Sequence, residues 1–554
     1  MPPLVLYNGP IYTLDPERPT ARAILINGGR VQAVGSEGRV QAAAAGLRAE
    51  TINLQGRAVV PGLTDAHVHI TWQGMTAFEV RLGGATTIEE AQRLIAERAN
   101  ALPPGAWLRG GGWDHTAWGR RWPTRAELDA VCPDRPAILS RKDGHSIWVN
   151  SRALELAGIT SDTPDPPGGA IQRDRDGEPT GILTETAMEL VRQVVPPHSE
   201  AERLEALRAA FREALSYGIT SIHVPPGTNH IDAPRTLGDL QTLRARGELS
   251  VRTLAYFAQP DLQRAVEMGL RSGLGDRWLR IGGLKLFADG ALGSESAEML
   301  THYEGRRHTG IATIEPELLN ELVLTANANG IAVMIHAIGD AANRKVLDAI
   351  ERAQRETGYG PQAAAADQEA PSSGQPAPNR QAPLPNRIEH VQVLHQKDVG
   401  RLAQLGVIAS MQPIHCTSDM EVADALWGSR CAYAYAWRSL CSTGATLAFG
   451  SDAPVESMNP WLGVHAAVTR QRPGGIPEGG WYPEQRLSVE EALWAYCVGP
   501  AIASGEAHEK GRLIPGMLAD LTVLTGDPFR SAPGELHAIT AAMTILEGDV
   551  VFER

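Results

Sequence analysis

The stretch VPGLTDAHVHI, residues 60–70, decides the fold. Its apolar residues are typical of a β-strand, and His67 and His69 stand two apart within it, so both side chains are expected on one face. If that face lines the inside of a barrel, both imidazoles reach one metal ion from a rigid element. A hydrogen-bonded pair of core histidines is the alternative, and the spacing alone leaves both interpretations open.

Seven further short apolar runs follow this stretch, with amphipathic helical segments between several of them. Alternating strands and helices predict a parallel sheet, and eight strands are the number that closes a β/α barrel. We therefore predict an α/β fold whose main domain, residues 59–504, is a (β/α)8 TIM barrel. The eight predicted strands are residues 63–70, 219–224, 251–257, 282–289, 331–337, 387–393, 407–413 and 446–452.

Three segments lie outside this repeat. Residues 1–58 and 505–554 are rich in short β-type runs and turns, which predicts one small β-sandwich domain built from both termini. About 150 residues separate the first two predicted strands, far more than a βα loop needs, so a subdomain inserted at residues 74–205 is expected after barrel strand 1. Residues 358–386, rich in Pro, Ala, Gln and Ser, are expected to form a disordered loop.

The composition and charge of the chain argue against several classes of protein. The 554 residues carry a net charge of −13, and no basic stripe interleaved with aromatic residues occurs, so nucleic acid is not an expected partner. Five cysteines without CxxC spacing argue against a disulfide framework or a thiolate zinc site. The chain shows neither a signal-peptide pattern nor 18 consecutive apolar residues, so we expect a cytoplasmic protein without a membrane partner.

Polar residues end several of the later apolar runs. His336 ends the fifth predicted strand, His390 lies in the sixth and Asp452 ends the eighth. Catalytic residues of β/α barrels come from the C-terminal ends of different strands, which makes these three candidate metal ligands. Lys285 lies in the fourth strand between two leucines, where a lysine must be paired, neutral or modified. Its alternative role is a structural salt bridge to Asp289.

Other polar residues are candidates for binding the substrate or for supporting the metal ligands. Asp114 and His145 stand in glycine-containing turns of the predicted insertion, where they could bind substrate or pack the subdomain. His223 lies in the second predicted strand and could donate a hydrogen bond to a developing oxyanion. Asp65 could orient a ligand imidazole or cap the preceding turn.

Together, VPGLTDAHVHI, LKLFADGALGS, IHAIGD, RIEHV and FGSDAPV resemble the amidohydrolase superfamily, specifically the amidohydrolase 3 branch that includes N-substituted formamide deformylase-like proteins. The resemblance implies that His67 and His69 bind the more buried of two metal ions. It assigns the more exposed ion to His336 and His390. Asp452 would contact the first metal and the reactive water.

The same resemblance implies that Lys285 matches a lysine that carbon dioxide can carboxylate. The resulting carbamate would bridge two metals, whereas an unmodified Lys285 favours a single metal. Zinc is the first expectation, at one or two ions per chain, because it suits imidazole and carboxylate ligands. Iron, manganese and nickel are the alternatives.

The expected activity is hydrolysis of a carbon–nitrogen bond other than a peptide bond, in a small linear amide such as an N-substituted formamide. A divalent ion lowers the pKa of its water to about 7, and Asp452 would take the water's proton and deliver it to the leaving amine. A cyclic amidase or deaminase-type hydrolase, and a catalytically inactive binding protein, are the alternatives. Fold alone does not choose between the enzymes. A homodimer is left open.

Overall fold

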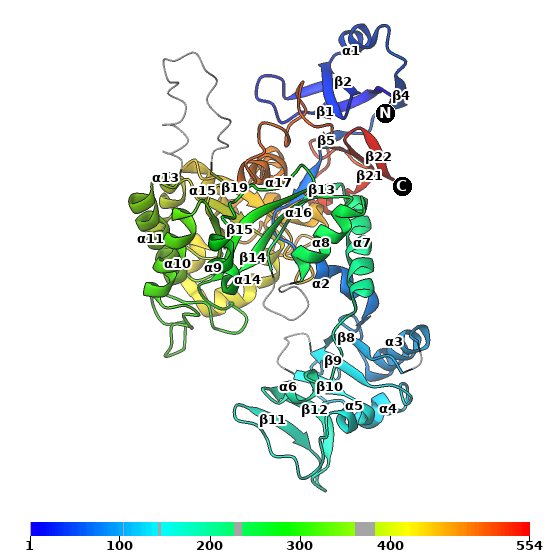
Figure 1. The fold of residues 1–554 in the computed structure, drawn as a ribbon, viewed down its shortest axis with the longest axis vertical. Helices are drawn as coiled ribbons and strands as arrows, with labels where there is room; N and C mark the ends of the chain where they lie inside the picture. The colour runs from blue at the N-terminus through cyan, green and yellow to red at the C-terminus, as the bar shows by residue number, and fades with distance from the viewer. Residues whose placement is uncertain (1, 104, 142–145, 227–234, 361–382) are drawn as a thin grey trace. The chain divides into compact units, whose positions relative to one another are not determined.

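The computed structural model describes residues 2–103, 105–141, 146–226, 235–360 and 383–554. The chain divides into two compact units, residues 71–209 and the remainder, which are described separately (Figure 1). His145 and most of the predicted disordered loop, residues 361–382, lie outside the described residues. In the described part of the chain, no helix is both long enough and apolar enough to cross a membrane.

The larger unit contains a nearly closed parallel barrel of eight strands, which confirms the predicted fold (Figure 1). Neighbouring strands pair in chain order from β6 to β19, and the amide of Ala66 reaches the carbonyl of Phe449 at 3.0 Å between the first and last strands. The strands are β6 (Leu63–Asp65), β13 (Ile219–Val224), β14 (Arg252–Ala258), β15 (Leu279–Phe287), β16 (Ala332–Ala337), β17 (Arg387–His390), β18 (Ile408–Met411) and β19 (Leu447–Phe449).

The first barrel strand is shorter than predicted. β6 ends at Asp65, so His67 and His69 follow the strand instead of lying within it. The chain turns here because the Asp65 carboxylate accepts the backbone N–H of His67, at 3.2 Å. Backbone bonds from Val68 to His223 and from His69 to Ala453 still tie the segment to neighbouring elements. The two histidines are therefore held by the barrel rim.

Helices connect the strands, and their apolar faces follow the helical period. In α11 (Asp340–Thr357), Ala342, Val346, Ile350 and Ala353 recur at three or four residues and are buried. Pro316 begins α10 (Pro316–Ala328), and a Ser488–Glu491 capping box begins α17 (Val489–Ala503). The other helices of this unit include α8 (Thr236–Ala245), α9 (Leu262–Glu267), α13 (Arg401–Leu405), α14 (Pro413–Trp427), α15 (Trp437–Ser442) and α16 (Pro460–Thr469).

Strands from both chain ends form one eight-stranded sheet beside the barrel in the same unit. Leu6, Ile24, Val59, Leu521 and Ile545 are buried in its shared core, so neither end completes it alone. Its members are β1 (Leu4–Tyr12), β2 (Thr20–Asn27), β3 (Arg30–Gly35), β4 (Glu50–Asn53), β5 (Val59–Pro61), β20 (Leu521–Leu524), β21 (Ala541–Leu546) and β22 (Asp549–Glu553), with α1 (Glu37–Ala44) packed on it.

The second unit has its own sheet and core. Trp113, Trp118, Trp122 and Trp148 pack in one aromatic cluster, and the indole N–H of Trp113 donates to the carbonyl of Leu139 at 2.8 Å. The sheet comprises β7 (Val80–Arg81), β8 (Leu108–Trp113), β9 (Ala137–Arg141), β10 (Ser146–Val149), β11 (Gly169–Arg173) and β12 (Pro179–Glu185). Its helices include α3 (Ile88–Ala101), α4 (Arg125–Asp129), α5 (Ser151–Leu156) and α6 (Met188–Arg192).

Candidate metal centre

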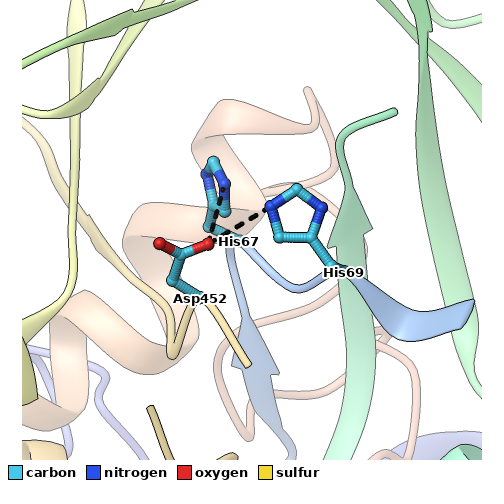
Figure 2. A group of neighbouring side chains, drawn as sticks. All are labelled: His67, His69 and Asp452. Carbon is cyan, nitrogen blue, oxygen red and sulfur yellow. Dashed lines mark ion pairs between the residues drawn. The ribbon is translucent and has the colours of Figure 1, made fainter. Parts of the chain in front are cut away.

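His67, His69 and Asp452 converge at the rim of the barrel (Figure 2). The Nε2 atoms of His67 and His69 lie 3.5 and 3.3 Å from Oδ1 of Asp452. The ligand atoms of all three residues lie within 4.8 Å of one another, close enough to share one cation. Asp452 adopts a left-handed backbone conformation with φ of 61°, and its N–H donates to the carbonyl of His67 at 2.7 Å.

The charges of this group are set by burial and by its neighbours. Burial lowers the pKa of His67 to about 4, which favours a neutral imidazole. Burial by itself raises the pKa of Asp452, but the hydrogen bond from His69 holds it well below its usual value. The group therefore combines the neutral imidazole of His67 with the anionic carboxylate of Asp452 at neutral pH.

A second group of potential ligands shares Asp452. Its other members are His390, at the end of β17, and His415, in the first turn of α14, again with ligand atoms within 4.8 Å. The two rings are parallel, with centroids 6.0 Å apart. His415 Nε2 lies 3.7 Å from Asp452 Oδ2 and has no hydrogen-bond partner among the described residues. Sequence reasoning missed His415, although it follows a predicted strand at the rim where barrel sites form.

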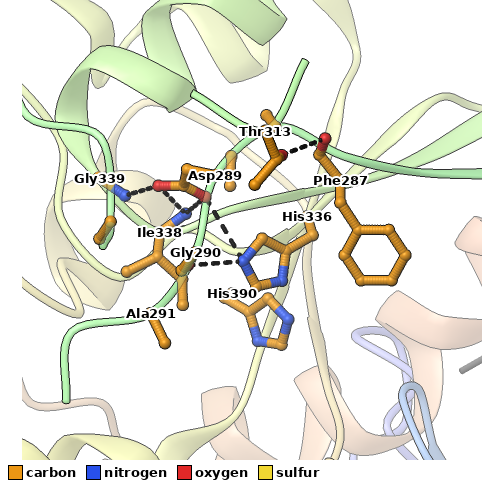
Figure 3. Close-up of polar contacts among 12 residues, drawn as sticks. Phe287, Asp289, Gly290, Ala291, Thr313, His336, Ile338, Gly339 and His390 are labelled. Atoms are coloured by element: carbon orange, nitrogen blue, oxygen red, sulfur yellow. Dashed lines mark hydrogen bonds and ion pairs between the residues drawn. The ribbon is translucent and has the colours of Figure 1, made fainter. Parts of the chain in front are cut away.

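His336, the last residue but one of β16, lies beside His390, and its Nε2 points toward Gly290 and Asp289 (Figure 3). Its ring centroid is 4.6 Å from that of His390. Its Nε2 lies 2.9 Å from the carbonyl of Gly290 and 3.4 Å from Asp289 Oδ1. A carbonyl only accepts, so Nε2 carries the proton and Nδ1 is the nitrogen left for a metal. Burial, followed by the charge of Lys285, lowers the pKa of His336 to about 4.

Lys285 is buried in β15 without a salt bridge to Asp289. The carboxylate of Asp289 instead accepts backbone N–H groups from Ile338, Gly339 and Glu298 (Figure 3). Lys285 Nζ has no hydrogen-bond partner in the part of the chain that the structure describes. Burial lowers the pKa of Lys285 to about 8. The salt-bridge alternative is therefore wrong, because Lys285 Nζ forms neither an ion pair nor a hydrogen bond with Asp289.

Two other predicted residues lie against the same region. His223 is buried in β13, with Nδ1 2.8 Å from Nη1 of Arg387. Asp65 accepts the N–H and the hydroxyl of Ser451 at 2.9 and 2.5 Å, in addition to the His67 N–H. The described contacts of Asp65 thus hold the two backbone segments that carry His67 and Asp452.

Asp114 belongs to the second unit. Its carboxylate accepts the N–H and the hydroxyl of Thr116 and pairs with Arg141 at 3.3 Å. These contacts show a packing role within the insertion, and a substrate-binding role for Asp114 stays a prediction. The same is true of His145, which lies outside the described residues.

The residues present fit a zinc-like ion. Two imidazoles and a carboxylate are typical zinc ligands, and the other ring nitrogen of His67 hydrogen-bonds to the carboxylate of Glu389, as metal-bound histidines usually do. The orphaned nitrogens of His415 and Lys285 are also explained by a cation or a modification, since buried polar atoms rarely lack partners. Such a site could activate water for hydrolysis.

Comparison with known proteins shows the family of the chain. Residues 50–552 match the amidohydrolase family. The chain is 35% identical to the protein LONG AFTER FAR-RED 3 of Arabidopsis thaliana, covering 97% of this chain and 90% of that one. It is 30% identical to the N-substituted formamide deformylase of Arthrobacter pascens, covering 100% and 98%. A metal-dependent hydrolase structure from Pyrococcus horikoshii superposes with a TM-score of 0.77 at 29% identity, covering 96% and 99%. The chain therefore belongs to the amidohydrolase family and is a hydrolase of carbon–nitrogen bonds.

Proposed function

We propose that this chain is a zinc-dependent hydrolase of small linear amides, with N-substituted formamides as the first substrate class to test. The observation that carries the metal centre is the convergence of His67, His69 and Asp452 at the barrel rim. The substrate class is supported by the likeness to N-substituted formamide deformylase, which extends over nearly the full length of both chains. The five free cysteines support a reduced, cytoplasmic setting.

His67 and His69 would hold the first ion through Nε2, with Asp452 as its third protein ligand. His390 would hold a second ion, together with His336 through Nδ1. The lack of a hydrogen-bond partner for Lys285 Nζ supports carboxylation, because the oxygens of a carbamate would bind metal ions and give this buried side chain partners. The geometry also favours His415 as an additional ligand or donor beside His390.

A bound divalent ion supplies a water of lowered pKa and polarises the carbonyl oxygen of the amide. Asp452 would take the proton of the attacking water at a carboxylate oxygen and pass it to the leaving nitrogen. His223 would donate a hydrogen bond from its Nε2–H to the carbonyl oxygen as negative charge develops there. Water and the amide thus yield a carboxylic acid, which is formic acid for a formamide, and a free amine.

The test combines metal analysis with product analysis. Protein purified without chelator is assayed for metal by mass spectrometry, and then for formate release from N-benzylformamide against ring opening of succinimide. Asp452→Asn is the inactive comparison, and His308→Gln, at an exposed histidine paired with Glu295, is the matched control. We expect formate release that needs metal and is lost only in Asp452→Asn. Ring opening of succinimide without formate release would favour the cyclic amidase alternative.

A further inference from the structure

A fully buried ion pair lies next to His67 in the barrel. Arg387 and Glu389 stand two apart on β17, so both side chains face the same side of the sheet, and neither is exposed to solvent. Arg387 Nε donates to Glu389 Oε1 at 2.6 Å and Nη2 donates to Oε2 at 3.0 Å. This is the two-bond arrangement in which arginine binds a carboxylate with a defined orientation.

Further hydrogen bonds lock the pair in place. Nη2 of Arg387 also lies 2.7 Å from the carbonyl of Ala66 and 2.6 Å from the hydroxyl of Ser410, so its two N–H bonds are shared among three acceptors. The Ser410 hydroxyl in turn donates to Glu389 Oε2 at 2.7 Å. Taking two charges out of water costs more than their attraction usually returns, so such a pair is weak evidence for stability. A role in the neighbouring site is the better explanation.

Each member of the pair contacts one histidine. Glu389 requires a ring nitrogen that donates a hydrogen bond, whereas Arg387 requires one that accepts. Glu389 is a carboxylate held by a guanidinium, so it only accepts, and the Nδ1 of His67 must donate to it. The Nε2 of His67, which faces Asp452 at 3.5 Å, is then left with its lone pair.

Arg387 imposes the reverse arrangement on His223. A guanidinium has only donors, so the Nδ1 of His223 must accept from Nη1, at 2.8 Å. The proton of His223 therefore sits on Nε2, which is buried and has no partner among the described residues. One ion pair thus leaves a free lone pair on the Nε2 of His67 and a proton on the Nε2 of His223.

We propose that Arg387 and Glu389 are positioning residues that set the tautomers of His67 and His223 in opposite senses. The pair prepares His67 Nε2 to bind a cation and His223 Nε2 to donate a hydrogen bond. The assigned use of these two atoms rests on the proposed function, whereas the tautomers themselves do not.

The tautomers can be measured without metal. Chelator-treated protein labelled with ¹⁵N-histidine is recorded in a two-bond ¹H–¹⁵N experiment, with His67→Gln and His223→Gln used for assignment. We expect a neutral His67 protonated on Nδ1 and a neutral His223 protonated on Nε2. A His67 proton on Nε2, or a His223 proton on Nδ1, would overturn the proposal. The wild-type spectrum decides this even if variants of the ion pair fail to fold.

Zinc affinity tests the consequence. Glu389→Gln keeps the shape of the side chain but removes its charge, and loss of such a metal-supporting partner costs about 10- to 100-fold in affinity. Glu506→Gln is the matched control, because Glu506 is also buried and paired with cations, Lys510 and Arg280. Equal zinc affinity in Glu389→Gln and wild type would overturn the positioning role. Expected tautomers in a wild-type protein that binds no zinc would support the tautomer assignment and refute the proposed function.

Discussion

Replacing Lys285 by methionine is expected to stabilise the metal-free protein. Lys285 Nζ is buried without a hydrogen-bond partner in the described residues, and burial lowers its pKa from 10.5 to about 8. That difference corresponds to about 3 kcal/mol of folding free energy lost to a buried charge at pH 7. Methionine has a similar length and no charge, so Lys285→Met should recover most of this free energy.

The direction in which stability changes with pH follows from the lowered pKa of Lys285. Below pH 8 the amine is protonated in the folded and unfolded chains, and the folded chain bears the full cost. Between pH 8 and 10.5 the folded chain releases the proton first, so its stability rises. The advantage of Lys285→Met should therefore be about 3 kcal/mol at pH 7 and close to zero at pH 10.5.

The assay is urea denaturation of chelator-treated protein in buffer free of carbon dioxide, which keeps Lys285 unmodified, at both pH values. Lys345→Met is the control, because Lys345 Nζ donates to Glu298 at 2.6 Å and its loss should destabilise the protein. A Lys285→Met variant that is no more stable than wild type at pH 7 would refute the reasoning. The same variant should lose any metal that depends on a carbamate.

Further predictions concern the metal groups and the supporting ion pairs. Asp452→Asn should remove most tightly bound metal, because both ligand groups share this carboxylate; retention of wild-type metal after dialysis would contradict it. His415→Gln should weaken only the second group, lowering a two-metal content to one; an unchanged content would exclude it as a ligand. Asp520→Asn should destabilise the protein by about 3 kcal/mol in urea, because it leaves Arg252, buried and bound at 2.6 Å, without its main partner; unchanged stability would show that the pair contributes nothing. Burial alone would raise the pKa of Glu506, but nearby cations lower it to about 2. The contribution of ionised Glu506 to folding stability should therefore be complete above pH 4.5 and lost as the pH falls from 4.5 to 2. Glu506→Gln should remove that part of the acid transition, and an identical acid profile would argue against it.

The barrel and the family could be predicted from local patterns. Each βα repeat carries its own apolar run and amphipathic helix, and strand periodicity is a local property of the chain. His390 and Asp452 became candidates for a similar reason, because each is a polar residue at or near the end of an apolar run, whereas His67 and His69 became candidates through their spacing of two residues. Their metal-binding roles remain predictions that the experiments above address.

Contacts across the barrel were decided only by tertiary structure. Glu389 reaches the centre because β17 brings it beside His67, which is 322 positions away. His415 reaches it because α14 carries the side chain back beside His390 and Asp452. Lys285 does not pair with Asp289, whose carboxylate accepts the backbone N–H groups of Ile338 and Gly339. The sequence by itself determined which segments of the barrel become strands, but not where each strand ends, because β6 ends at Asp65 where the carboxylate accepts the N–H of His67. The pairing of those strands determined which side chains meet, because hydrogen-bond partners and buried charges depend on distances that no local pattern encodes.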